Sequence, residues 1–193
     1  MTEIANPMDV SAESLINHYA RRDKKDAKWP DVAFAMKGVP GTPCCVQLSR
    51  GFCGAGLIVP TKSWSRTTGK FPPATGWRTF YSVDEVEIFL AEKFGDSDNL
   101  RTGENGKPRG AGAIKSMLRG IPGVLVMRHA PIRRYPPKNK FEHTEIWDGY
   151  GFVQQDMAVD ALLESPYVKF WPDKTFGWIS GPDSIDPSIS DLA

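Results

Sequence analysis

Two adjacent cysteines, Cys44 and Cys45, stand where the sequence predicts the start of a helix. Thr42 suits the capping position before that helix, and Pro43 suits its first position, where the missing N–H of proline costs nothing. Cys44 then lies in the first turn, where unpaired backbone N–H groups and the helix dipole favour an anion and lower the pKa of a thiol. A thiol that ionises easily is a nucleophile, so this stretch predicts covalent chemistry.

The two thiols differ in the face of the helix on which they lie. An apolar stripe at helical spacing consists of Cys45, Leu48, Phe52 and Ala55. Because such a stripe packs against the core, Cys45 is interpreted as a small buried hydrophobe, and so is Cys53. Cys44 is one residue off the stripe and is free to face a cleft. It is therefore the candidate nucleophile, and Cys45 is its rival.

A base for that nucleophile is predicted on a later strand at residues 141–147, which the turn signal Asp148-Gly149 ends. Side chains alternate along a strand, so His143 and Glu145 share one face. A cysteine nucleophile requires a base within hydrogen-bond reach and a third group that orients the base. The candidate catalytic residues are accordingly Cys44, His143 and Glu145.

Other residues compete for these roles. His129 is the rival base, although no carboxylate partner lies near it in the sequence. Asp148 is the rival orienting group, but it sits in a turn and on the face opposite His143. His18 is interpreted as a surface or core-edge residue of the first helix. A non-catalytic interpretation also stands, in which Cys44 is a buried structural thiol and His143 packs against aromatic residues.

Helices that could position these residues are predicted from capping signals and apolar spacing. The first is capped near Ser11 and Ser14, and the cysteine helix follows a stiff Gly/Pro loop at residues 38–43. The remaining signals are a break at Trp29-Pro30, a helix from the capping box Ser82-Val83-Asp84-Glu85 to the stop at Gly95, and short helices at 114–119 and 157–163.

Extended segments and loops complete the expected architecture. The continuous apolar run at 123–128 predicts a central strand, and residues 77–81 predict a short one. The polar loop at 95–110 and the Pro-rich loop at 131–140 are expected to form cleft walls, the first as a mobile loop on the substrate side. The expected fold class is α+β, with N-terminal helices packed on a small antiparallel sheet. Residues 1–180 are expected to form a single catalytic domain and 181–193 a loose tail.

Composition narrows the function classes. The chain has 193 residues, 40% of them hydrophobic and 24% charged, with a formal net charge of +1. This balance gives no support to nucleic-acid binding or to binding at a membrane surface. No signal peptide and no apolar run long enough to span a membrane is expected. Three cysteines, two of them adjacent, argue against a disulfide framework and against a structural zinc site, and neither a cofactor nor a metal is expected.

Three segments together resemble the fourth family of type VI secretion amidase effectors. Cys44–Arg50, followed by Leu57–Pro60, is similar to the family's Cys-Ala-Ile-Arg-Met-Ser segment. Tyr81–Glu85 with Phe94-Gly95 looks like its middle helix, and Glu142–Gly149 looks like its Gly-His-Ile-Asp-Leu-Trp segment. The resemblance covers roughly residues 10 to 172. Its weight lies in the order and spacing of these segments.

The resemblance implies a papain-like NlpC/P60 fold and hydrolysis of peptidoglycan stem peptides between D-glutamate and meso-diaminopimelate. It implies Cys44 as nucleophile, His143 as base and Glu145 in place of the family's usual Asp. It also implies a protein that is made in the cytoplasm without a signal peptide and secreted by the type VI apparatus. Such a toxin acts in the periplasm of a target bacterium, and a cognate immunity protein inhibits it.

Three residues differ from the family pattern and bear on substrate preference. Glu145 is one methylene longer than Asp, Gln47 replaces an Arg, and Glu142 replaces a Gly and adds negative charge beside the site. Two other functions stay open on the sequence alone. One is a catalytically silent binding module, and the other is a papain-like protease or transferase that acts on a different amide.

Overall fold

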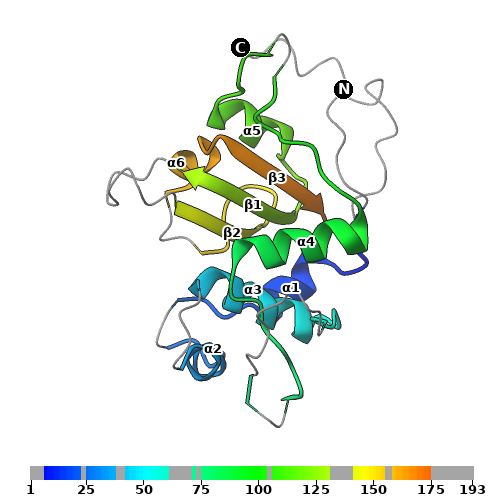
Figure 1. Ribbon diagram of the computed structural model, residues 1–193, viewed down its shortest axis with the longest axis vertical. Coiled ribbons are helices and arrows are strands. Elements are labelled where there is room, and N and C mark those ends of the chain that lie inside the picture. The colour runs from blue at the N-terminus through cyan, green and yellow to red at the C-terminus, as the bar shows by residue number, and fades with distance from the viewer. Residues whose placement is uncertain are drawn as a thin grey trace.

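The helices of the protein pack around one small sheet. The computed structural model describes residues 7–22, 25–37, 42–60, 71–72, 75–103, 106–130, 141–154 and 158–174. In chain order the elements are α1 (Ala12–His18), α2 (Trp29–Ala35), α3 (Pro43–Gly54), α4 (Val83–Phe94), α5 (Ala111–Met117), β1 (Gly123–Ala130), β2 (Phe141–Trp147), α6 (Val159–Leu163) and β3 (Tyr167–Pro172). The strand order is β2-β1-β3, and both pairs are antiparallel (Figure 1).

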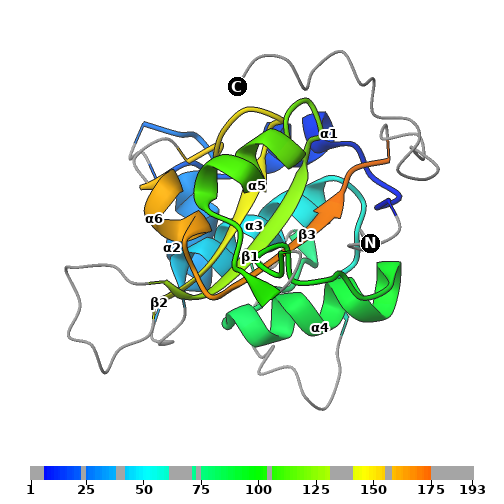
Figure 2. The same ribbon diagram turned by 90° about the horizontal axis from the view of Figure 1, so that it is seen from above.

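The sheet separates two hydrophobic clusters. The first contains side chains of α1, α3 and α4, and the second contains side chains of α5 and α6. Along β1 the side chains alternate, because Val124 and Val126 belong to the first cluster and Leu125 and Met127 to the second. Figures 1 and 2 show the helices on the two faces accordingly. The expected α+β class, with N-terminal helices on a small antiparallel sheet, is confirmed.

Local signals placed most helix ends correctly. Ser11 caps α1 and accepts a hydrogen bond from the Ser14 N–H at 3.2 Å. At α4, Ser82 and Glu85 form the predicted capping box, and Gly95 follows the helix with a φ of 82°, a conformation that L side chains rarely adopt. The central position of the strand that begins at Gly123 is also confirmed.

Two local predictions were wrong. Trp29-Pro30 does not end a helix but begins α2, since proline in a first turn has no N–H to lose. Residues 77–81 are not a strand of the sheet; they run beside α3, where the Phe80 N–H donates to the Ser49 hydroxyl at 2.9 Å. Both segments contribute to a small third hydrophobic cluster that includes Val46 of α3, and the second segment also bonds to the Ser49 hydroxyl. Spacing along the sequence does not reveal these contacts with α3.

The polar loop after α4 follows the outer edge of β3. The Leu100 N–H donates to the Val168 carbonyl at 2.7 Å, and the indole of Trp171 donates to the Gly95 carbonyl at 2.9 Å. Because β1 lies between β3 and β2, residues 95–103 lie at the opposite edge of the sheet from β2, the strand that carries His143. At these residues the loop predicted for the substrate side runs along β3 and not along β2. The predicted loops at 38–41 and 131–140 and the tail at 181–193 lie outside the described residues.

Gly123 is the tightest position of the central strand, which leads to a prediction. A Cβ at this residue would collide with the Trp171 carbonyl oxygen and the Phe170 ring. Gly123→Ala is therefore expected to lower the free energy of unfolding by about 3 kcal/mol, because β1 and β3 must move apart. The matched control is Gly112→Ala in α5, where a Cβ would meet no atom within 4 Å and helix propensity favours alanine.

Urea unfolding of the wild type and the two variants measures both effects. Gly112→Ala is expected to raise the free energy of unfolding by up to about 1 kcal/mol. Equal unfolding midpoints for wild type and Gly123→Ala would contradict the described packing of β1 on β3.

Candidate active site

The start of α3 places Cys44 as the sequence predicts. Thr42 has extended backbone angles at the N-cap, Pro43 is the first helical residue, and Cys44 and Cys45 complete the first turn. The Thr42 side chain does not cap the helix. Its hydroxyl lies 3.2 Å from the Cys45 sulfur and 2.9 Å from the Tyr81 carbonyl. Thr42 therefore fixes the helix start against the chain that precedes α4.

Neither thiol lies in an open cleft. Cys44 is 7% exposed and Cys45 is fully buried, and both belong to the first hydrophobic cluster. Their sulfur atoms are 4.0 Å apart. The expectation that Cys45 is a core residue is confirmed, whereas Cys44 is far less accessible than a residue facing a cleft. Cys53 is partly buried at the edge of the same cluster, and all three cysteines are free thiols.

His143 and Glu145 meet as the alternation of β2 predicts. The His143 Nε2 lies 3.4 Å from the Glu145 Oε2, and both side chains are buried. The Phe141 ring stacks beside the imidazole with centroids 6.0 Å apart, and the Phe152 ring lies 6.3 Å away on a tilted plane. These aromatic neighbours restrict the rotation of the imidazole and keep water from its ion pair.

The site lies at the outer edge of β2, where the two faces of the sheet meet. The register sets His143 opposite Met127 and Glu145 opposite Leu125, both members of the second cluster. Cys44 belongs to the first cluster, yet its charge and hydrogen bond act directly on the His143 imidazole. Because β2 is an edge strand, its side chains can reach around it to the helix start. The fold thus brings together residues that are about one hundred positions apart in the chain.

The charges of the site support a thiolate at Cys44. A hydrogen bond from the Cys45 thiol and the nearby His143 imidazolium lower the pKa of Cys44 well below its ordinary value, against the effect of burial. The Thr144 backbone N–H adds a further hydrogen bond to the sulfur. Burial and the neighbouring Cys44 thiolate raise the pKa of Cys45 well above its ordinary value. These opposite directions of the two pKa values favour ionisation of Cys44 over that of Cys45.

Neighbouring charges raise the pKa of the His143 imidazole. Burial alone would lower the pKa of His143, but the Cys44 thiolate and the Glu145 carboxylate outweigh burial and raise that pKa to about 10. Burial raises the pKa of Glu145 as well, while hydrogen bonds from His143, the Ile146 N–H and the Tyr19 hydroxyl oppose the rise. The geometry therefore favours a thiolate–imidazolium pair beside a carboxylate.

The rival residues lie in other environments. His129 is partly exposed at the end of β1, has a positive φ of 65°, and its Nδ1 lies 4.0 Å from Glu142. The Asp148 carboxylate accepts hydrogen bonds from the N–H groups of Tyr150 and Gly151, both at 2.8 Å, and so stabilises the turn after β2. His18 is bonded to the Ser14 carbonyl at 2.9 Å on α1.

Two of the three departures from the family pattern have structural roles. The Gln47 amide donates to the Ala20 carbonyl at 2.6 Å and to Gln154 at 3.3 Å, so it ties α3 to the chain after α1. Glu142 lies 3.9 Å from the Arg128 guanidinium. The expectation that Glu142 adds negative charge beside the site is wrong, because its carboxylate pairs away from His143.

Tyr19 is a further member of the site, which its sequence context does not indicate. Its hydroxyl donates to the Glu145 Oε2 at 3.2 Å, and only 1% of the residue is exposed. In the sequence Tyr19 continues the apolar spacing of the first helix, which indicates packing and nothing more. Thr144 was missed because its contribution is a backbone N–H, for which no side-chain signal exists.

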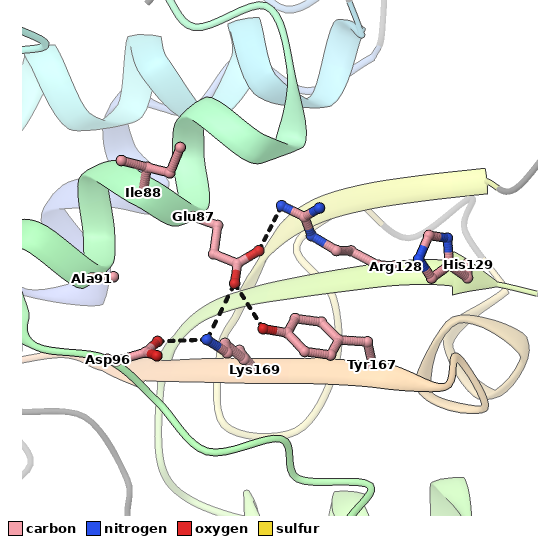
Figure 3. A pocket seen from close by; sticks show the side chains of 8 residues that line it. All are labelled: Glu87, Ile88, Ala91, Asp96, Arg128, His129, Tyr167 and Lys169. Carbon is pink, nitrogen blue, oxygen red and sulfur yellow. Dashed lines mark hydrogen bonds and ion pairs between the residues drawn. The ribbon is translucent and has the colours of Figure 1, made fainter. Parts of the chain in front are cut away.

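A separate hollow of about 410 Å³ lies between α4 and the strands β1 and β3. Figure 3 shows Glu87 at its centre, joined to Arg128, Lys169 and Tyr167, while Asp96 pairs with Lys169. The Cys44 thiol does not line it. Because these charged groups pair with one another, we assign the cluster to the packing of α4 on the sheet.

The described residues contain no cluster of three or more His, Cys, Asp or Glu side chains that could hold a metal ion. Within the same parts of the chain, no helix is long and apolar enough to cross a bilayer.

Comparison with known proteins gives a likeness of structure. No protein-family model and no curated protein matches the sequence. The crystal structure of the type VI effector Tae4 from Enterobacter cloacae is similar, with a TM-score of 0.62 and 14% identity, over 88% of this chain and 99% of that one. The chain has the Tae4 fold.

Structures of complexes show the same fold. Tae4 of Salmonella typhimurium with the immunity protein Tai4 from Enterobacter cloacae gives a TM-score of 0.57 and 17% identity, over 85% of this chain and 99% of that chain. The Tae4–Tai4 effector–immunity complex of Enterobacter cloacae gives 0.60 and 14%, over 86% of this chain and 100% of that one. The Tae4 fold thus extends over most of the chain.

The different ionisation of the two thiols leads to a prediction. Only thiolates react with iodoacetamide, so at about pH 6 Cys44 is expected to be alkylated while Cys45 and Cys53 are not. Burial raises the pKa of Cys53 too. Mass spectrometry of peptides from the labelled protein identifies the modified residue. In denaturant at alkaline pH all three should react, which serves as the control. Labelling of Cys44 only near pH 9 would show an ordinary thiol and contradict the ion pair.

Proposed function

We propose that the protein is a cysteine amidase of the papain-like NlpC/P60 type that hydrolyses peptidoglycan stem peptides. The observation that carries the proposal is the buried arrangement of Cys44, His143 and Glu145 at the junction of a helix start and an edge strand. The sequence resemblance and the Tae4 fold support the choice of substrate. The bond we propose is the amide between D-glutamate and meso-diaminopimelate.

The first half of the mechanism is acyl transfer to sulfur. The Cys44 thiolate attacks the amide carbonyl and forms a tetrahedral oxyanion, which backbone N–H groups at the start of α3 stabilise. The His143 imidazolium gives the proton of Nδ1, the ring nitrogen that does not face Glu145, to the leaving nitrogen, so the C–N bond breaks and a free amine departs. A thioester on Cys44 and a neutral imidazole remain.

The second half restores the enzyme. Neutral His143 takes a proton from a water molecule, and the hydroxide attacks the thioester carbonyl. The C–S bond breaks, the product leaves as a carboxylic acid that gives its proton to the solvent, and the thiolate–imidazolium pair forms again. Glu145 orients the imidazole and stabilises its positive charge throughout, as the carboxylate of a catalytic triad does.

We further propose that the protein is an antibacterial effector delivered by type VI secretion into the periplasm of a target bacterium. The structures that share its fold are described as type VI effectors, and two of them hold an immunity protein. A cognate immunity protein is the partner that we propose for this chain. Directing the protein to the periplasm of a Gram-negative host should cause lysis, whereas cytoplasmic expression and exported Cys44→Ala should not.

Mass spectrometry of muropeptides tests the enzymatic proposal directly. Purified peptidoglycan is digested with the wild type or with Cys44→Ala, and the soluble fragments are sequenced by fragmentation. We expect wild-type products with a new amino group on meso-diaminopimelate and a new carboxyl group on D-glutamate. Cleavage of another amide would indicate a protease or transferase of different specificity. The absence of any cleavage would favour a catalytically silent binding module.

A further inference from the structure

The candidate triad carries a glutamate whose carboxylate has to be held in place. Glutamate has one more rotatable bond than aspartate, so its carboxylate samples more positions around an imidazole. In the structure the Glu145 Oε2 lies 3.4 Å from the His143 Nε2, slightly beyond an ordinary hydrogen bond. A second group on the same oxygen therefore determines how steadily the carboxylate faces the base.

Tyr19 provides that second group. Its hydroxyl donates to the Glu145 Oε2 at 3.2 Å, the same oxygen that faces His143. The other oxygen, Oε1, accepts the Ile146 N–H at 2.8 Å. Glu145 is fully buried and Tyr19 almost so. An ionised carboxylate without water requires such donors, because burial without them is costly.

The fold fixes Tyr19 rigidly. It directly follows α1, and its backbone N–H caps the helix by donating to the Leu15 carbonyl at 2.8 Å. Gly51 of α3 lies at the point where α1, α3 and β2 meet. A Cβ there would lie 3.3 Å from the Leu15 oxygen, 3.9 Å from the Tyr19 Cα and 3.9 Å from the Ile146 side chain. The backbone of Tyr19 thus lies where α1, α3 and β2 pack closely together, and such packing suits a positioning group.

We propose that the Tyr19 hydroxyl is a positioning residue of the site, which holds the ionised Glu145 carboxylate against the His143 imidazole. The inference rests on the proposed function, because it assigns a role within the same thiolate–imidazolium pair. Tyr19 acts through Glu145 and touches no reacting atom.

Loss of the Tyr19 hydroxyl should shift the pH dependence of Cys44 reactivity in one direction only. The titratable groups around Glu145 are His143 on its own strand, Tyr19 after α1 and, beyond the imidazole, Cys44 of α3. Without the donor, Glu145 holds its proton to higher pH. A neutral Glu145 no longer stabilises the imidazolium, and the thiolate loses its counter-charge. The acidic limb of Cys44 reactivity therefore moves to higher pH.

The experiment measures the alkylation rate of Cys44 by iodoacetamide against pH in wild type and Tyr19→Phe. We expect the midpoint of the acidic limb to rise by about one pH unit, which corresponds to a tenfold change in the ionisation equilibrium. The matched control is Tyr167→Phe, which removes a tyrosine hydroxyl bonded to a glutamate, Glu87, at 2.9 Å outside the site. Its profile should coincide with that of wild type.

A double-mutant cycle separates positioning from a general loss of packing. In the Glu145→Gln background, Tyr19→Phe should produce no further shift, because the carboxylate through which Tyr19 acts is gone. Site-specific 3-fluorotyrosine at position 19 keeps the shape and makes the hydroxyl a stronger donor. It should move the midpoint to lower pH, and it also covers the case in which Tyr19→Phe does not fold.

The outcomes distinguish the two proposals. If wild-type Cys44 reacts at mildly acidic pH and the Tyr19→Phe profile coincides with it, the role of Tyr19 is refuted while the proposed function stands. An equal shift in both backgrounds of the cycle also refutes that role. If wild-type Cys44 is inert below about pH 8, no ion pair exists, and both proposals are overturned.

Discussion

Replacing Cys44 by alanine is expected to lower the rate of amine release from purified peptidoglycan by at least about 10⁴-fold, since loss of a nucleophile removes the whole covalent route. The side chain is buried, but it is small and loses only one sulfur atom, so the fold should tolerate the change. Amine release, measured with a fluorogenic reagent, quantifies the loss, and the unfolding transition confirms that the variant is folded.

The matched control for this prediction is the neighbouring thiol. Cys45→Ala removes the same atoms one residue later, from a side chain that is fully buried. It should keep activity within about tenfold of wild type, the residual loss coming from the hydrogen bond that Cys45 gives to the thiolate. Full activity of Cys44→Ala together with an inactive Cys45→Ala would reverse the assignment of the nucleophile.

Replacing His143 by alanine should be almost as severe, with a loss of about 10⁴-fold or more, because one side chain serves both as acid and as base. The variant should also lose the alkylation of Cys44 at mildly acidic pH, since the imidazolium no longer stabilises the thiolate. This second readout does not depend on the substrate. In the wild type the imidazolium should persist until the pH approaches 10, the raised pKa of His143.

His129→Ala is the control that tests the rival base. His129 sits near the end of β1, and its Nδ1 lies 4.0 Å from Glu142. Activity and Cys44 alkylation should both stay within about twofold of wild type, as for other surface substitutions. An inactive His129→Ala with an unchanged His143→Ala would assign the role of the base to His129.

Much of the site could be predicted from the sequence because its signals are local. Proline and threonine mark the start of α3, and this start fixes the position of Cys44. Alternation along β2 brings His143 and Glu145 together. In both cases the geometry follows from the backbone of one element, so no knowledge of distant contacts was needed.

The remaining features depend on packing between distant segments. The exposure of Cys44 is set by α1, α4 and β2 together, and spacing along α3 says nothing about those elements. The same holds for β3, whose aromatic residues gave no clear assignment and whose partner β1 is about forty residues earlier. The loop at 95–103 is polar in sequence, yet it forms hydrogen bonds along the edge of β3.

The Tyr19–Glu145 hydrogen bond joins residues 126 positions apart, so it closes most of the described chain into one loop. Closing a loop of this length is entropically costly and belongs to the slow, non-local part of folding. A chain emerging from the ribosome can form α1 and α3 early, but it has no acidic thiol until β2 has docked. Newly made or partly folded protein would therefore carry a chemically ordinary Cys44, and reactivity would appear only after β2 has docked beside the start of α3.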